Sequence, residues 1–360
     1  APLPLNNAEI APGTIALLHS PAEPLDCDAG GYSLAILVTG IGYMGAALVE
    51  ALLARGDRVI GLDNRFSTDE TALERLCAAG LDFVDGDVAE PTDVQTVFNR
   101  APISAVYHFA AQASAHPAAA DVAYTERTNL QGPRVILDEM LRHGTPTIVY
   151  ASSFKVYGEA LRGRIDEQQQ YGTFRDMSHL SKVHAEKLLE MYAALHGLRC
   201  LSLRFGIVHG RGPIFKTDPR FMTAPNKFCW QAVRGETISV LGGGRAPAGW
   251  LHLADAIDAT IAAAGHQAFT GYVPINVVGE VMSVAQVAAL VREAAATHGL
   301  PATIEGIDVD DLSDEAARFT VASALDAVSA TRARHHLRES LPTVLEYCIA
   351  LNAEQSIRSA

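Results

Sequence analysis

The segment LAILVTGIGYMG, residues Leu34 to Gly45, decides the fold of this chain. Its apolar run stops at a glycine-rich turn, and an Ala/Leu/Val-rich segment follows to Leu53. A strand, a tight turn and a helix in this order form the context in which G-x-G-x-x-G glycines bind a dinucleotide. Gly40 permits the sharp turn, Gly42 lets the backbone approach a pyrophosphate, and the third glycine lets helix and strand pack closely. The phosphates would lie at the helix N-terminus, on its unpaired N–H groups.

A second apolar run, residues 58–62, reads as the next strand and ends in Asp63. This aspartate lies about twenty residues past the glycines, where an acid accepts hydrogen bonds from the adenosine ribose hydroxyls. A carboxylate there repels a 2′-phosphate, so the sequence favours NAD over NADP. The nearby Arg65 keeps NADP open as an alternative.

Composition excludes several classes of protein. The chain has 360 residues, of which 49% are hydrophobic, so it can bury a large core. Its net charge of −13 and its lack of a long basic block argue against nucleic acid as the main partner. No apolar run approaches the roughly 18 residues of a membrane span, and no signal-peptide pattern opens the chain. We therefore expect a cytoplasmic protein that has no membrane partner.

Cysteine and histidine usage predicts neither disulfides nor a metal site. The five cysteines, which are scattered and form no C-x-x-C pair, are Cys27, Cys77, Cys200, Cys229 and Cys348. We expect them to be buried small side chains in a reducing compartment. The 13 histidines show no zinc-ligand spacing.

Short apolar strands alternate with helical stretches along the first two thirds of the chain. The six expected strands are 34–39, 58–62, 81–85, 104–109, 146–151 and 199–205. This alternation predicts an α/β fold, a doubly wound parallel sheet of Rossmann type with helices on both faces and a smaller α/β C-terminal substrate lobe.

Composition shifts suggest the domain boundaries. The Pro-rich residues 1–33 read as an N-terminal extension, and 34–206, with later returning segments, as the dinucleotide-binding domain. Residues 207–351, which are punctuated by Pro and Gly, are expected to form mainly the substrate lobe, and 352–360 a tail. The polar stretch 163–177 reads as a loop over the site.

Eight segments in this order resemble the extended short-chain dehydrogenases/reductases, the NAD-dependent epimerase/dehydratase group that mostly acts on nucleotide sugars. The segments are LVTGIGYMG, VIGLDN, GDV (86–88), VYHFAAQ (106–112), TNLQG (128–132), IVYASSFKVYG (148–158), LSKVHAEKL (180–188) and LRFGIVHG (203–210). The resemblance covers nearly everything except the N-terminal arm.

The resemblance implies NAD as cofactor and a role for each matching residue. Around the diphosphate and adenosine, the implied contacts are Gly40, Gly42, Tyr43, Met44 and Gly45, with Asp63 and Asn64 at the ribose and Asp87 and Val88 at the adenine. Towards the nicotinamide, they are Phe109, Ala110, Ala111, Asn129 and Lys182, the last of which would hydrogen-bond the nicotinamide ribose.

The catalytic pattern of the family is broken in this chain. The family's Y-x-x-x-K tyrosine takes a proton from the substrate hydroxyl, and its pKa is lowered by the lysine. Here Lys182 remains but Ser178 stands at the tyrosine position. A serine hydroxyl is far too weakly acidic to replace a phenol, and Tyr171 lies seven residues upstream.

Three residues are candidates to replace the tyrosine. His179 titrates near neutrality, Ser178 would position a water or the substrate, and Lys155 would act as a base if its pKa were depressed. Ser153 matches the family's catalytic Ser or Thr. Phe154 and Lys155 occupy the positions of the Asp–Glu pair of many dehydratases, which argues against the usual 4,6-dehydration.

The substrate side also departs from the family. Ile207 replaces an asparagine that contacts the nucleotide sugar, and Ala248 replaces a diphosphate-binding arginine for which Arg245 could substitute. A bidentate arginine is the natural partner of a diphosphate. These changes suggest a substrate without the usual nucleotide diphosphate, or altered chemistry.

The leading hypothesis is an NAD-dependent epimerase/dehydratase-like oxidoreductase acting on a sugar-like or polyhydroxylated small molecule, which includes secondary metabolites. Oxidation followed by epimerisation or reduction is the expected reaction. The alternatives are an NAD-binding protein without redox catalysis and a non-redox lyase or cyclase that retains NAD. The resemblance also implies a homodimer, through the long helices near 121–143 and 178–196.

Overall fold

The computed structural model describes most of the chain beyond the N-terminal arm. The described residues are 34–114, 121–158, 161–240, 243–307, 319–327 and 333–358. The extension predicted for residues 1–33 lies outside them.

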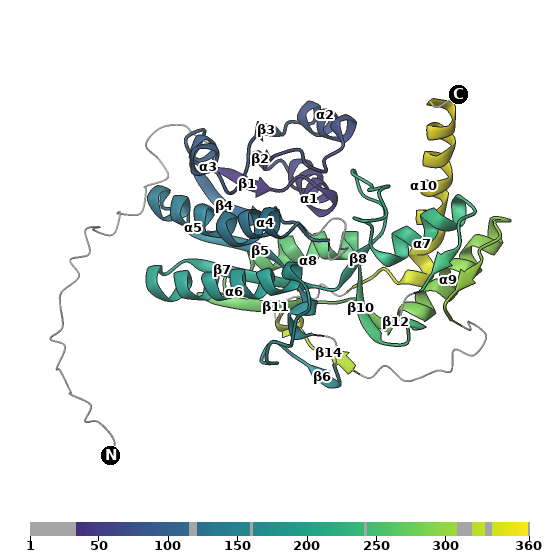
Figure 1. The fold of residues 1–360 in the computed structure, drawn as a ribbon. Helices are drawn as coiled ribbons and strands as arrows, with labels where there is room; N and C mark the ends of the chain where they lie inside the picture. The colour runs from purple at the N-terminus through teal and green to yellow at the C-terminus, as the bar shows by residue number, and fades with distance from the viewer. Residues whose placement is uncertain are drawn as a thin grey trace, which may run out of the picture. The chain divides into compact units, whose positions relative to one another are not determined.

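A seven-stranded parallel sheet, in the order β11-β7-β5-β4-β1-β2-β3, forms the centre of the fold (Figure 1). Its strands are β1 (Ala35–Thr39), β2 (Val59–Asp63), β3 (Asp82–Asp85), β4 (Ile103–His108), β5 (Thr147–Ser153), β7 (Arg199–Phe205) and β11 (Tyr272–Val277). The doubly wound α/β fold predicted from the sequence is therefore confirmed, with all six predicted strands in place.

The seventh strand, β11, escaped prediction because Pro274 interrupts its apolar run. Proline cannot donate to a strand ladder, so it is confined to sheet edges. β11 is such an edge, since it pairs only with β7 in the seven-stranded sheet.

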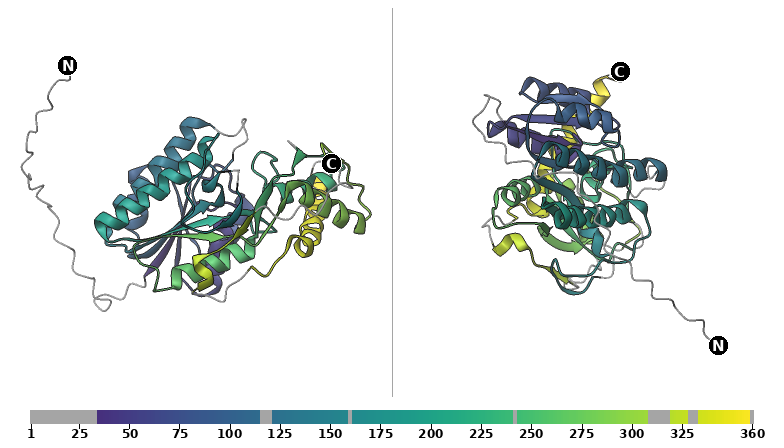
Figure 2. Two further views of the ribbon diagram at one scale, coloured as in Figure 1. Left: turned by 90° about the horizontal axis from the view of Figure 1, so that it is seen from below. Right: turned by 90° about the vertical axis from the view of Figure 1, so that its left-hand side faces the viewer.

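Helices cover both faces of the sheet and enclose two apolar cores (Figure 2). One core takes side chains from α1 (Tyr43–Ala54), α2 (Glu70–Ala78) and α8 (Leu253–Gly265). The other takes them from α3 (Pro91–Phe98), α5 (Gly132–His143) and α6 (Met177–His196). α8 and β11 follow the first part of the second lobe in the sequence but pack in the central sheet and its core. The chain therefore crosses into the second lobe and returns.

A π-helical turn precedes α5. The short α4 (Val122–Thr125) continues into η1 (Glu126–Gln131), whose backbone has the wider π-helical winding. Such π-bulges occur frequently at functional sites. Asn129 lies in this turn.

The second lobe has its own small sheet and core. In the left view of Figure 2 the yellow α10 and the green helices beside it lie apart from the central sheet. The sheet contains β8 (Ile207–His209), β10 (Pro247–His252) and β12 (Glu280–Ser283). The helices are α7 (Ala224–Val233), α9 (Val284–Thr297) and α10 (Leu337–Arg358).

The remaining short elements are β6 (Gly163–Ile165) paired with β14 (Phe319–Val321), β9 (Ile238–Ser239) paired with β13 (Ile304–Glu305), and the 3-10 turns η2 (Phe154–Tyr157) and η4 (Ala324–Ala327).

Two expectations from the sequence were wrong in part. The stretch 163–177 begins with strand β6 and contributes no residue to the lining of the site described below, because β14 pairs with it from a distant part of the chain. Cys77 is exposed on the outer side of α2, whereas Cys200, Cys229 and Cys348 are buried as expected. Within the described residues, no helix combines the length and the apolar character that crossing a membrane requires.

Candidate active site

The carboxyl ends of β1, β2, β4 and β5 border one cavity of about 810 Å³. Open α/β sheets bind ligands at this edge. Its opposite wall comes from the second lobe, which contributes β8, β10 and α7. The volume of the cavity and its position between the sheet edge and the second lobe therefore suit a dinucleotide with a second small molecule beside it.

The three glycines of the turn meet the geometric demands predicted for them. Gly40 has φ +80°, and a Cβ there would lie 2.4 Å from the nitrogen of Ala110. A Cβ on Gly45 would lie 1.8 Å from the carbonyl oxygen of Gly40. Gly42 differs, because a Cβ there would meet nothing within 4 Å. The space over Gly42 is left for a ligand, as the pyrophosphate role requires.

The first turn of α1 presents unpaired backbone donors. No side chain caps the helix, and its first turn holds no acidic residue. The first four N–H groups of a helix have no partner inside the helix, and together with the helix dipole they attract an anion. The Tyr43 hydroxyl, by contrast, donates to the carbonyl of Gly210 at 2.7 Å. The turn thus fits a pyrophosphate without any side chain of its own.

Asp63 ties the end of β2 to the glycine turn. Its Oδ2 accepts from the N–H of Ile41 at 2.7 Å, and its Oδ1 accepts from the N–H of Arg65 and the hydroxyl of Thr68, each at 2.7 Å. The Arg65 guanidinium pairs with two acidic side chains, those of Glu70 and Asp85. Arg65 is therefore engaged by acidic side chains, and Asp63 presents its carboxylate at the end of β2, where Rossmann-type sheets bind the adenosine ribose.

The residues expected at the adenine divide into one that lines the cavity and one that does not. Val88 lines it, but the buried Asp87 does not. The Asp87 carboxylate pairs with Arg127 and accepts from the Asn64 amide at 3.2 Å and from the N–H of Ala89 at 2.9 Å. Asp87 thereby orders Asn64 and the turn after β3.

Asn129 lies behind the cavity wall rather than in it. Its amide accepts from the N–H of Gln112 at 2.8 Å, and donates to the carbonyl of the same residue and to the Ser181 hydroxyl, both at 2.9 Å. These bonds fix the irregular segment that follows β4, in which Phe109, Ala110 and Ala111 line the cavity. The wider π turn η1 carries Asn129 at this depth.

Lys182 lies buried at the cavity wall on α6. Its ammonium donates to the carbonyl of Ala151 at 2.6 Å and lies 4.8 Å from the centre of the Tyr150 ring. Burial, offset in part by the Glu186 carboxylate, lowers the pKa of Lys182 to about 8. A lysine with this pKa can exchange a proton near neutrality.

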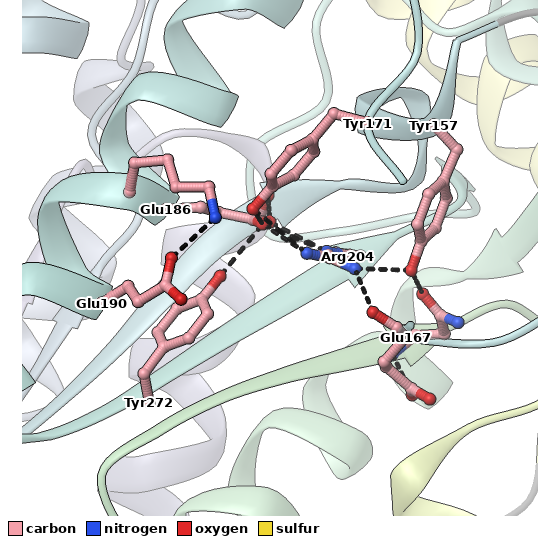
Figure 3. Close-up of polar contacts among 10 residues, drawn as sticks. Tyr157, Glu167, Tyr171, Glu186, Glu190, Arg204 and Tyr272 are labelled. Carbon is pink, nitrogen blue, oxygen red and sulfur yellow. Dashed lines mark hydrogen bonds and ion pairs between the residues drawn. The ribbon is translucent and has the colours of Figure 1, made fainter. Parts of the chain in front are cut away.

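Ser178 lines the cavity, whereas the phenol of Tyr171 does not. Ser178 is buried, and its hydroxyl lies 3.4 Å from the carbonyl of Gln112. The Tyr171 hydroxyl donates to Glu186 at 2.8 Å, in a network below the cavity (Figure 3). Tyr171 is therefore committed to a structural contact.

His179 is held by a carboxylate at the start of α6. Its Nδ1 lies 2.6 Å from Oδ2 of Asp176, whose Oδ1 also accepts the His179 N–H at 3.0 Å. Burial raises the pKa of Asp176, but the hydrogen bonds from His179 outweigh it and lower that pKa overall. With Nδ1 occupied by Asp176, a histidine that lines the cavity keeps Nε2 for a ligand.

Ser153 and Lys155 also line the cavity, at the end of β5. The Ser153 hydroxyl accepts from the N–H of Lys155 at 3.2 Å and caps the 3-10 turn η2. Both side chains therefore belong to the same wall as Lys182 and His179. All five residues expected to carry the chemistry line this one cavity, namely Ser153, Lys155, Ser178, His179 and Lys182.

On the lobe side, Ile207 and Ala248 line the cavity as the sequence predicted, whereas the exposed Arg245 does not. Three cations that sequence reasoning missed line it instead, namely Lys216, Arg220 and Lys227. They come from an irregular Pro-containing stretch and from α7, where no spacing rule singles out a ligand-facing side chain.

A buried polar network surrounds Glu186 on α6, the helix that carries Lys182 (Figure 3). Arg204 on β7 donates to the Glu186 carboxylate at 2.6 Å and to the Tyr157 hydroxyl at 2.6 Å. Tyr272 and Tyr171 donate to the same carboxylate at 3.0 and 2.8 Å. Glu186 lies one turn after Lys182, so this network fixes the face of α6 that carries the lysine.

The glycine turn before α1 and the buried lysine on α6 together define the class of protein. It is of the extended short-chain dehydrogenase/reductase type. The chain belongs to the NAD-dependent epimerase/dehydratase family, whose model matches residues 36–279. Both the fold and the resemblance predicted from the sequence are thus confirmed.

Among curated proteins the chain is similar to sugar-nucleotide epimerases. UDP-glucuronate 4-epimerase 2 of Arabidopsis thaliana is 30% identical over 218 residues, which is 58% of this chain and 49% of the relative. UDP-glucose 4-epimerase of Erwinia amylovora is 30% identical over 177 residues, which is 48% of this chain and 52% of the relative. The matches thus span about half the length of these relatives.

Solved structures show the same fold over most of the chain. UDP-glucose 4-epimerase of Thermotoga maritima with UDP-glucose superposes with a TM-score of 0.75 at 22% identity, and the match covers 89% of this chain and 100% of that one. MoeE5 in complex with UDP-glucose and NAD gives a TM-score of 0.72 at 25% identity, covering 90% and 99%.

Proposed function

We propose that this protein is an NAD-dependent enzyme that oxidises a hydroxyl-bearing carbon of a sugar-like substrate and then reduces the same centre, as an epimerase does. The observation that carries the proposal is a single cavity that joins the glycine turn to Lys182, Ser153, Lys155 and His179. MoeE5, at 25% identity, is described in complex with UDP-glucose and NAD. This likeness supports both the cofactor and the substrate class.

The chain's own residues suggest how NAD would be held. Bound NAD would supply the two-electron oxidant. The N–H groups of α1 would bind its pyrophosphate, Asp63 its adenosine ribose and Lys182 its nicotinamide ribose. The buried Asn129 would keep the segment after β4, beside the nicotinamide, in place.

His179 is the base that we favour for the substrate hydroxyl. Asp176 fixes its tautomer and compensates the imidazolium that forms when Nε2 takes the proton. Ser153 would orient the substrate oxygen, and Ser178 would leave room beside it for the imidazole. Lys155 is the alternative base, since it lines the same wall.

Replacing His179 tests this assignment. His179→Ala is expected to lower kcat by about 10²–10⁴-fold, the usual contribution of a general base, and Asp176→Asn to lower it less. His184 is exposed on the same helix and provides the matched control, so His184→Ala should keep wild-type kcat. The measurement is kcat on a nucleotide sugar that the wild type converts, with and without added imidazole.

Recovery of His179→Ala by imidazole would support a proton-transfer role over a structural one. Full turnover by His179→Ala would move the role to Lys155, which Lys155→Ala would then reveal. If both variants kept full turnover, the assignment of the base would fail.

The lobe wall suggests that the substrate carries an anionic group as well as a sugar-like one. Lys227 on α7 lines it, as does Arg220, whose guanidinium is paired with Asp218, whereas Ala248 offers no guanidinium. Cations paired with phosphate or carboxylate oxygens form strong charge-assisted hydrogen bonds. A nucleotide sugar or another phosphorylated or acidic sugar would satisfy this wall.

We also propose a homodimer. Leu180, Met191 and Leu195 lie exposed on α6, and Val122 lies exposed on α4. The three α6 positions follow helical spacing and share one stripe. Burial of this stripe against a second copy would shield large apolar side chains from water.

A further inference from the structure

The segment 210–223, called the strap below, leaves the second lobe after β8 and returns to it at α7. Between these points it is fastened to the dinucleotide-binding domain. Three of its hydrogen bonds to that domain run from the Tyr43 hydroxyl to the Gly210 carbonyl at 2.7 Å, from Arg75 to the Pro213 carbonyl at 3.3 Å, and from the Ser114 hydroxyl to the Arg220 carbonyl at 2.6 Å. Ile214 of the strap is buried in the core on the α1 side of the sheet.

Aromatic contacts hold the far end of the strap over the adenosine side of the cavity. Phe221 meets Phe66, which follows β2, edge to face, with ring centres 6.4 Å apart. Phe66 in turn stacks on Tyr124 at 4.7 Å. All three rings line the cavity. The strap therefore reaches the wall at which Asp63 would bind the ribose.

Lys216 is the strap residue that points toward this wall. It lines the cavity, and its ammonium lies 3.4 Å from the Ser67 hydroxyl and 5.3 Å from the centre of the Phe221 ring. Burial lowers its pKa, although the carboxylates of Asp63 and Asp218 act in the opposite direction. The half-buried ammonium thus lies within the field of Asp63.

The donor capacity of this ammonium is largely unused. An ammonium has three N–H donors and no acceptor, and its hydrogen bond to a described residue is the long one to the Ser67 hydroxyl. The cavity beside it is where an acceptor-rich ligand would engage the other donors.

We propose that Lys216 is a cofactor-binding residue supplied by the strap, and that its ammonium donates to oxygen atoms of the adenosine ribose and phosphate of NAD. The inference rests on the proposed function, since it presumes NAD at the glycine turn. It adds a contact from the second lobe, so that bound NAD fastens the strap and the strap slows release of NAD.

Lys216→Met removes the ammonium and keeps most of the side-chain length. We expect the Kd for NAD and for ADP-ribose to rise by about ten-fold or more, as for loss of a charge-assisted hydrogen bond, and NAD to dissociate faster. The Kd for nicotinamide mononucleotide should not change. Lys187→Met, which removes an exposed lysine paired with Glu190 on α6, is the charge-matched control and should bind NAD like the wild type.

Calorimetric titration of each ligand gives the three Kd values, and thermal unfolding of the ligand-free variants checks that each is folded. Equal NAD and ADP-ribose affinities in Lys216→Met and the wild type would overturn the role of Lys216 while leaving the proposed function intact. An equal loss for nicotinamide mononucleotide would also overturn it. Absence of NAD binding by the wild type would instead contradict the proposed function.

Discussion

Gly45→Ala is expected to weaken NAD binding by about 100-fold or more, equivalent to roughly 2.8 kcal/mol. A Cβ at this position would lie 1.8 Å from the carbonyl oxygen of Gly40, which is backbone and cannot rotate away. Relief requires α1 to move from β1, and that movement carries the unpaired N–H groups away from the pyrophosphate position. The variant should also unfold at a lower temperature.

Gly42→Ala is the matched control, because it adds the same methyl group three residues away in the same turn. Nothing lies within 4 Å of its Cβ in the ligand-free structure. Its stability should stay within about 0.5 kcal/mol of the wild type, while its NAD affinity falls because the methyl group occupies ligand space. Calorimetry with NAD and thermal unfolding separate the two effects. Wild-type NAD affinity in Gly45→Ala would contradict this account of the turn.

Glu186→Gln is expected to destabilise the protein by about 3–5 kcal/mol, the usual cost of leaving one member of a buried ion pair uncompensated. Glu186 is 0% and Arg204 3% exposed. The guanidinium would lose its carboxylate, and the hydroxyls of Tyr171 and Tyr272 would lose a charged acceptor (Figure 3). Chemical denaturation of the ligand-free protein measures the change in the free energy of unfolding.

Two further variants distinguish a buried pair from a general effect on the helix. Glu190 lies one turn after Glu186 on α6 and pairs with Lys187 at the surface (Figure 3). Glu190→Gln should therefore lower the free energy of unfolding by less than about 1 kcal/mol. Replacing Glu186 and Arg204 together by Leu and Met should recover much of the loss, because no unpaired charge remains. A Glu186→Gln variant as stable as the wild type would show that the Glu186–Arg204 ion pair contributes nothing to stability.

The sequence could specify the cofactor side of the site because that side depends on short-range backbone patterns. Gly45 is required by a contact within the turn and Gly40 by its positive φ, whereas the close approach of Gly40 to Ala110 involves a distant segment. Asp63 follows from the end of the next strand. The family's order of segments added Asn129 and Lys182. Their roles toward NAD remain proposals, but the structure places Lys182 at the cavity wall and Asn129 directly behind it.

The remaining features depend on contacts between distant segments. The Tyr171 hydroxyl donates to Glu186, and the same carboxylate accepts from Arg204 on β7. Lys216 lies in an irregular stretch where neither periodicity nor a motif marks it. β11 was hidden by Pro274, which is acceptable only because that strand lies at the sheet edge.

Rapid anaerobic mixing of the NAD-loaded protein with UDP-glucose, UDP-glucuronate and their parent sugar phosphates tests the central claim most directly. The readouts are the near-ultraviolet absorbance of reduced nicotinamide and the products formed. We predict that at least one of these compounds produces reduced nicotinamide before or during turnover, and that Lys182→Ala abolishes the signal. Turnover of any of them without reduced nicotinamide at any time would contradict an oxidation–reduction mechanism at this site.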